Sequence, residues 1–234
     1  MIFRNRSDVT LEIINKKTEI KAIIFDFDFT LADSSKGVFE CVNYALQELG
    51  FRRFPKNEIN KTIGLTLDHT LVKLVGKQHS DKTEKFKHFF IKKADEVMAD
   101  LTVLFTETPR VVQVLYNKGI KLGIVSTKFR YRIAAILSRE NLLNCFEVIV
   151  GGEDISALKP DPSGLLLAIK KLKISPSEVV YIGDSLTDAE TANRAGISFI
   201  AILSGVTPQI AFARYKVRDF LKNISELPKI LNDQ

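Results

Sequence analysis

Short and almost continuous apolar runs recur along the chain, and each is bounded by Gly, Ser or Asp. The runs cover residues 22–25, 119–126, 146–150, 179–184 and 198–203. Runs of this length and character predict strands that are covered on both faces, as in a parallel sheet. Helical patterns lie between them at residues 108–119, 131–141, 161–173 and 185–196, and the third has Asp161 as N-cap and Pro162 in its first turn. Strands that alternate with helices predict an open, Rossmann-like α/β sheet.

Between Asp33 and about Leu104 the pattern changes to helices, and no convincing strand is found there. One apolar stripe at helical spacing joins Val38, Val42, Ala45 and Leu49, and a second joins Phe86, Phe90, Ala94, Val97 and Leu101. A shorter helix is expected over Thr66–Val75. We therefore expect a helical cap domain at residues 33–104, inserted after the first core strand, and a core formed by residues 1–32 and 105–234.

The first twenty residues form a separate pattern of strand, turn and strand. It predicts an extra strand at Val9–Ile14 that pairs with the strand leading to Asp26, or with another exposed edge.

The composition is that of a globular protein, with 234 residues of which 45% are hydrophobic and 26% charged. No apolar run reaches the roughly 18 residues of a membrane helix, and the N-terminus lacks the apolar centre of a signal peptide. Cys41 and Cys145 lie far apart in apolar patterns, as buried thiols in a reducing compartment do. These features predict a cytoplasmic protein without a membrane partner.

The net charge of +6 fits a negatively charged substrate or partner. The lysines are scattered along helical patterns, Trp is absent, and no aromatic residues alternate with basic ones in a stacking array. This pattern argues against nucleic acid as the partner and favours a small anion.

Chemically active side chains follow the apolar runs, at the points where the strands are expected to end. In chain order they are Asp26, Asp28, Ser126, Thr127, Lys159, Asp184 and Asp188. The carboxyl ends of parallel strands meet at one edge of a sheet, so these groups are expected to lie together. Crowded carboxylates repel one another unless a cation lies among them. Oxygen ligands suit a hard ion, and Mg²⁺ is the usual one where a phosphate shares the site.

The groups on the first two strands also have structural interpretations. Asp26 and Asp28 are consistent with turn residues at a strand end. Ser126 and Thr127 are consistent with N-caps of the following helix. Neither pair alone decides between a structural and a catalytic role.

The later groups have alternatives too. Ser185 and Asp188 have the spacing of a capping box, which would need no role in a site. Lys159 precedes a proline and is consistent with a solvated loop lysine. Asp184 ends an apolar strand, where an unpartnered carboxylate would be costly, and this favours a ligand role.

Taken in order, four motifs resemble those of the haloacid-dehalogenase-like (HAD) superfamily of phosphohydrolases. They are "DFDFT" at 26–30, "GIVST" at 123–127, "KPDP" at 159–162 and "GDSLTD" at 183–188. The helical insert resembles the cap of the phosphoglycolate-phosphatase-like branch. The resemblance extends from about Lys21 to Leu227.

The resemblance implies that Asp26 is the nucleophile, which attacks phosphorus and forms an aspartyl-phosphate. It implies that Asp28 protonates the leaving oxygen and then accepts a proton from the attacking water.

The same resemblance implies a Mg²⁺ site. Its ligands would be Asp26, the backbone carbonyl of Asp28, and Asp184, with Asp188 contacting the metal indirectly, through water or through another ligand. Ser126 and Thr127 would bind the phosphoryl group, and Lys159 would balance charge on the phosphate and the nucleophile.

Three positions depart from the pattern of this family. Phe29 occupies a position that is usually glycine, where a tight turn lies close to the substrate. Thr106-Glu107 stands in place of a Pro-Gly pair, and Ser126-Thr127 in place of Thr-Asn. None of these changes removes a catalytic atom.

These observations predict a Mg²⁺-dependent phosphatase for a small phosphorylated metabolite, such as a phosphoglycolate-like monoester or pyrophosphate. A phosphomutase of the same fold and a catalytically weak regulatory protein remain alternatives. A metal-free dehalogenase is disfavoured by Asp28 and Asp184. The sequence leaves the oligomeric state open.

Overall fold

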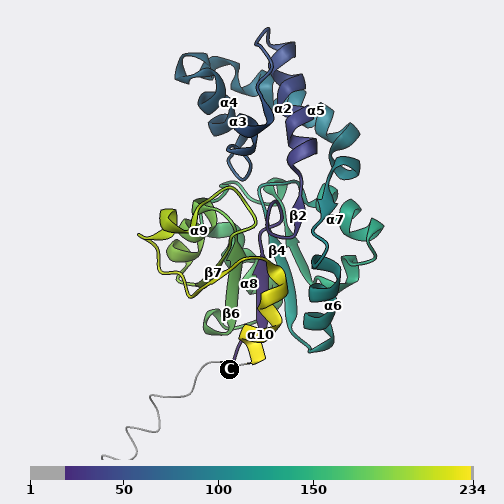
Figure 1. The fold of residues 1–234 in the computed structure, drawn as a ribbon, viewed down its shortest axis with the longest axis vertical. Helices are drawn as coiled ribbons and strands as arrows, with labels where there is room; N and C mark the ends of the chain where they lie inside the picture. Colours follow the sequence, from purple (N-terminus) through teal and green to yellow (C-terminus); the bar gives the residue numbers. More distant parts are fainter. Residues whose placement is uncertain (1–18, 233–234) are drawn as a thin grey trace, which may run out of the picture.

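A six-stranded parallel sheet forms the centre of the computed structural model, which describes residues 19–232 (Figure 1). Across the sheet the strands are β5 (Val148–Val150), β4 (Lys121–Val125), β1 (Ala22–Phe25), β6 (Val179–Gly183), β7 (Ser198–Ile202) and β8 (Asp219–Leu221). Every neighbouring pair is parallel. The predicted open α/β sheet is confirmed, as are the five strands expected from the apolar runs.

Helices cover both faces of this sheet, which explains why its strands are apolar on both sides. One face packs against α6 (Thr108–Asn117), α7 (Arg130–Arg139) and α10 (Leu227–Asn232). The other packs against α8 (Ser163–Leu172) and α9 (Leu186–Ala195). Alternate residues of β1 accordingly enter different clusters, Ile23 and Phe25 in the first and Ile24 in the second.

The register places the carboxyl ends of the central strands side by side. Phe25, the last residue of β1, lies opposite Ile124 on β4 and Ile182 on β6. The residues that follow these strands therefore leave the sheet at the same edge, which is where Asp26, Ser126 and Asp184 stand.

The segment after β1 forms a separate group of helices above this edge of the sheet (Figure 1). Its helices are α2 (Ser35–Glu48), α3 (Lys56–Asn60), α4 (Leu67–Val75) and α5 (Thr83–Leu101). They share a hydrophobic cluster of their own, which includes Val42, Leu71 and Phe86. We refer to this helical group as the cap. The division into two domains at residues 33 and 104 stays a prediction.

Three local features differ from what the sequence predicted. The two-residue strands β2 (Ala32–Asp33) and β3 (Val103–Leu104) pair antiparallel where the chain enters and leaves the cap. They were not expected, because two residues are too few to show a periodicity. Strand β8 was also missed. Helix α8 begins at Ser163 rather than within Asp161–Pro162, although the Asp161 carboxylate accepts a hydrogen bond from the Ser163 N–H.

Within residues 19–232, no helix combines the length and hydrophobicity that crossing a bilayer requires. Cys41 and Cys145 are buried and form no disulfide, as predicted. The strand predicted at Val9–Ile14 lies outside the described residues.

Candidate active site

Three carboxylates from two distant parts of the sequence meet at the carboxyl edge of the sheet. Asp26 follows β1, Asp184 follows β6, and Asp188 lies in the first turn of α9. One oxygen from each lies within 4.8 Å of the others, and all three residues are buried. We refer to Asp26, Asp184 and Asp188 as the acidic triad.

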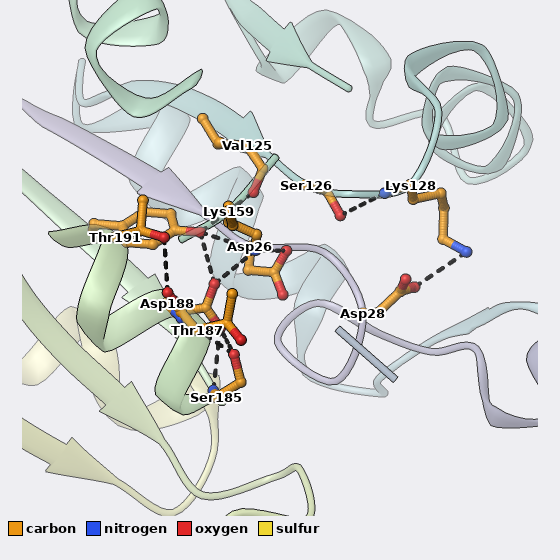
Figure 2. Close-up of polar contacts among 11 residues, drawn as sticks. Asp26, Asp28, Val125, Ser126, Lys128, Lys159, Ser185, Thr187, Asp188 and Thr191 are labelled. Carbon is orange, nitrogen blue, oxygen red and sulfur yellow. Dashed lines mark hydrogen bonds and ion pairs between the residues drawn. The ribbon is translucent and has the colours of Figure 1, made fainter. Parts of the chain in front are cut away.

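A buried lysine joins two members of the acidic triad (Figure 2). Lys159 Nζ lies 2.8 Å from Asp26 Oδ1 and 2.6 Å from Asp188 Oδ1. The residue is only 4% exposed. The alternative of a solvated loop lysine is therefore wrong, since the side chain is enclosed by the groups it neutralises.

Asp188 both caps the start of α9 and forms part of the site. Its Oδ2 accepts hydrogen bonds from the Ser185 N–H and hydroxyl, and its own N–H donates to Ser185 Oγ, which forms a capping box at the start of α9. Its Oδ1 faces Lys159. The helix start thus holds the carboxylate in place within the site.

Tyr181, which lies on β6, is a site residue that the sequence analysis missed. Its hydroxyl lies 2.9 Å from Asp188 Oδ1, to which it donates, and accepts a hydrogen bond from Lys159 Nζ at 3.2 Å. The ring is fully buried against the second face of the sheet. Because a buried tyrosine hydroxyl needs a partner, a tyrosine in an apolar strand just before a catalytic motif was a usable signal.

Burial shapes the electrostatics of the site. Burial raises the pKa of Asp26 to about 7, although Lys159 opposes this rise. Burial, together with the neighbouring Asp188 and Asp26, raises the pKa of Asp184 well above its usual value. The pKa of Lys159 is also raised, because Asp188 and Asp26 outweigh the effect of its burial. Among residues 19–232, three carboxylates thus face one lysine cation, and a second cation would relieve their repulsion.

Two glycines lie so close to the acidic triad that a side chain at either position would collide with its carboxylates. A Cβ on Gly205 would lie 1.8 Å from Asp184 Oδ2, and one on Gly183 would lie 2.4 Å from Asp188 Cγ. Neither distance is compatible with a side chain at these positions. The carboxylates are therefore held close together by backbone that approaches them directly. The acidic triad offers only oxygen ligands, is buried, and carries more negative charge than Lys159 neutralises. These properties fit a Mg²⁺ ion.

Asp28 points away from the acidic triad. Its Oδ1 lies 3.3 Å from Lys128 Nζ, and Figure 2 shows this pair on the opposite side of Asp26 from Asp188. The structure thus brings together the three side chains that were predicted to contact the metal, while the Asp28 side chain, for which no metal contact was predicted, lies apart from them. The prediction that the Asp28 backbone carbonyl binds the metal is untested. Lys128, which is 8% exposed, was not predicted as a site residue.

Ser126 and Thr127 lie between β4 and α7, next to this pair. Ser126 Oγ accepts a hydrogen bond from the Lys128 N–H at 3.3 Å, and α7 begins only at Arg130. Neither residue caps the helix, so that alternative is wrong. Ser126 is buried at the edge where Asp26 ends its strand (Figure 2).

A cavity of about 240 Å³ opens from this edge into the cap. Asp28, Thr127 and Lys128 line its core side, and residues 62–68 line part of its cap side. The next residue of the cap, His69, is not part of this lining. His69 is exposed, and its Nδ1 lies 3.0 Å from the Thr66 hydroxyl.

Comparisons with known proteins agree with this geometry. Residues 23–202 match the family model of the haloacid dehalogenase-like hydrolases. Phosphoglycolate phosphatase from Aquifex aeolicus is 30% identical over 216 residues, which cover 92% of this chain and 98% of the relative. Phosphoglycolate phosphatase from Escherichia coli strain K12 is 28% identical over 213 residues, covering 82% and 84% of the two chains.

Solved structures share the fold. A crystal structure assigned to the haloacid dehalogenase-like hydrolases, from Bacteroides fragilis, superposes with a TM-score of 0.86 at 41% identity. The superposition covers 89% of this chain and 100% of the other.

Proposed function

The chain belongs to the haloacid dehalogenase-like hydrolase family, and we propose that it is a Mg²⁺-dependent phosphatase that uses Asp26 as its nucleophile. The predicted family and the predicted enzyme class, a phosphoric monoester hydrolase, are confirmed by the matches to known proteins. The observation that carries the proposal is the acidic triad, buried and joined by Lys159.

Asp26 and Asp184 would hold the metal ion, with Asp188 contacting it directly or through water. The ion would supply positive charge against the phosphoryl oxygens. The carbonyl of Asp28 remains a candidate ligand. Ser126 and Thr127 would bind phosphoryl oxygens, and Lys159 would balance charge beside the nucleophile.

In the first half of the reaction, an Asp26 carboxylate oxygen attacks phosphorus and the bond to the leaving oxygen breaks. Asp28 donates its proton to that oxygen, so the leaving group departs as an alcohol. The position of Asp28 supports this role, because it lies on the cavity side of Asp26, where a leaving group can be accommodated.

In the second half, water attacks the phosphorus of the aspartyl-phosphate. Asp28, now ionised, accepts a proton from this water, and the bond between phosphorus and the Asp26 oxygen breaks. Inorganic phosphate is released, and Asp28 is protonated again.

The substrate is proposed to be a phosphate monoester of a small metabolite. Phosphoglycolate is the first ester to measure, since the named relatives are phosphoglycolate phosphatases. Pyrophosphate is the second, because it carries the same transferable group.

The test is phosphate release from a panel of esters, with Mg²⁺ or with excess chelator, for the wild type and Asp26→Asn. We expect a loss of roughly a thousandfold or more from the substitution, as for other nucleophiles, and a comparable loss without metal. Asp81→Asn makes the same chemical change at an exposed site and should leave turnover unchanged. Turnover that survives Asp26→Asn would refute the proposal. A folded wild type that binds Mg²⁺ and releases no phosphate would instead favour the mutase or regulatory alternative.

A further inference from the structure

The cavity between core and cap has walls that are mostly apolar. On the cap side it is lined by Val38, Val42, Phe90, Ile91 and Met98, and Leu158 adds an apolar surface from the core. Its core end meets Asp28, the proposed general acid, and Thr127, a proposed phosphoryl-binding residue. A phosphate seated at Asp26 would therefore direct its leaving group along these walls.

Two of the cations that line the cavity are paired with carboxylates outside the proposed catalytic groups. Lys87 Nζ lies 2.7 Å from Asp68 Oδ1, and Arg132 Nη2 lies 2.7 Å from Asp95 Oδ1. The third cation, Lys128, lies 3.3 Å from Asp28, the proposed general acid. A negatively charged leaving group at Lys87 or Arg132 would have to displace a protein carboxylate.

Displacement of this kind costs the ion pair that the protein already forms, a small loss because the Asp68 and Asp95 side chains are each 49% exposed. An uncharged group that covers the apolar walls carries no such cost and gains from the area removed from water. The ion pairs of the cavity and its apolar walls thus both favour an uncharged, apolar ligand group.

From these contacts we infer that the substrate carries an uncharged, largely apolar leaving group, such as an aryl or branched alkyl group. A cavity of about 150 Å³ holds benzene, so the observed cavity of about 240 Å³ accommodates a ring with substituents. This inference rests on the proposed phosphatase function, and it makes phosphoglycolate, with its carboxylate, a poor substrate for this chain.

Binding of phosphonates, which cannot be hydrolysed, tests the inference separately from turnover. Calorimetry with Mg²⁺ present would compare naphthylmethylphosphonate with 3-phosphonopropionate, which mimics phosphoglycolate. We expect the aryl compound to bind about tenfold more tightly or better, the scale of discrimination that an apolar pocket provides. Equal or tighter binding of phosphonopropionate would overturn the inference, whereas failure to hydrolyse any ester would count against the proposed function.

A cavity-wall variant gives a second measurement. Ile91→Ala shortens an apolar side chain on the cap wall and should weaken naphthylmethylphosphonate binding about fivefold or more, while phosphonopropionate binding stays unchanged. Ile210→Ala is the matched control, since Ile210 is 80% exposed and lies outside the cavity lining. Equal loss of affinity for both phosphonates in Ile91→Ala would contradict the inference.

Discussion

Phe29 holds a backbone conformation that is costly for any residue with a side chain. Its φ is 61°, in the left-handed region, and its carbonyl accepts a hydrogen bond from Ser204 Oγ at 2.5 Å. The side chain is 7% exposed. The turn that follows the nucleophile therefore keeps the conformation for which glycine is suited, and burial of the ring offsets part of the strain.

Two substitutions separate these effects. Phe29→Gly removes the buried ring and also relieves the strain of the left-handed backbone. Phe29→Ala removes the ring but leaves a side chain in this strained conformation. We expect both to destabilise the protein, Phe29→Ala by about 1 kcal/mol more than Phe29→Gly. Chemical unfolding measures the difference. If Phe29→Ala were the more stable of the two, the strain assigned to this turn would be wrong.

At the scale of single residues, the sequence identified the groups with distinctive chemistry. Asp26 and Asp184 could be predicted because charged residues at the ends of apolar strands are conspicuous, and Lys159 because it belongs to the motif "KPDP". Tyr181 and Lys128 could not be recognised in the same way. The tyrosine is hidden in an apolar run, and the ion pair between Lys128 and Asp28 depends on how two loops approach each other.

At the scale of elements, the contact between α5 and α7 fastens the cap to the core. The Arg139 guanidinium donates to the carbonyls of Ala99 and Thr102, at 2.7 Å and 2.8 Å. Ala99 lies in the last turn of α5 and Thr102 directly follows that helix, where carbonyls lack helical partners. Arg139 thus acts as a C-terminal cap supplied by another helix, and its positive charge suits the negative end of the helix dipole.

Removing this cap should weaken the protein without touching the acidic triad. Arg139→Ala is expected to lower the free energy of unfolding by about 1–2 kcal/mol, because two carbonyls lose a charged donor. The exposed Arg110 on α6 provides the matched control, and Arg110→Ala should change stability by less than about 0.5 kcal/mol. Equal effects of the two substitutions, measured by urea unfolding, would rule out the capping role.

The elements themselves could be predicted where a pattern was long enough to repeat. The five apolar strands and the long helices of the cap met that condition. Strands β2 and β3 did not, since they contain two residues each, and neither did β8, whose three residues include Asp219. All three exist only where a partner strand lies beside them. Their pairing depends on tertiary contacts that periodicity does not encode.

At the scale of the whole molecule, folding brings Asp26 into one buried volume with Asp184 and Asp188, which lie in a distant part of the sequence. This assembly has an energetic cost, because ionised carboxylates repel one another away from water. The pKa of Asp26 is raised from an ordinary value of 3.8 to about 7, mainly by burial. The folded protein consequently binds more protons than the unfolded chain between these pH values.

The sign of the pH effect follows from this difference in bound protons. Stability falls as pH rises wherever the folded state holds more protons than the unfolded state. The contribution of the protonated Asp26 carboxyl to the free energy of unfolding is therefore fully present below about pH 4, and it is lost as pH rises through about 7. Without metal, Asp26→Asn should exceed the wild type in stability at pH 7.5, by an amount on the order of a few kcal/mol, and the difference should shrink toward pH 5.

Mg²⁺ should offset the loss of stability that the ionised acidic triad causes at high pH. The ion binds ionised carboxylates, and only the folded chain brings them together. We expect 10 mM Mg²⁺ to raise the melting temperature of the wild type more at pH 7.5 than at pH 5, and to raise that of Asp26→Asn much less. Ca²⁺-free buffers and a matched ionic strength of NaCl control for nonspecific screening. Equal Mg²⁺ effects on the wild type and Asp26→Asn would show that the ion binds elsewhere. Equal effects at both pH values would show that the acidic triad is ionised already, so that its burial does not hold protons in the folded state.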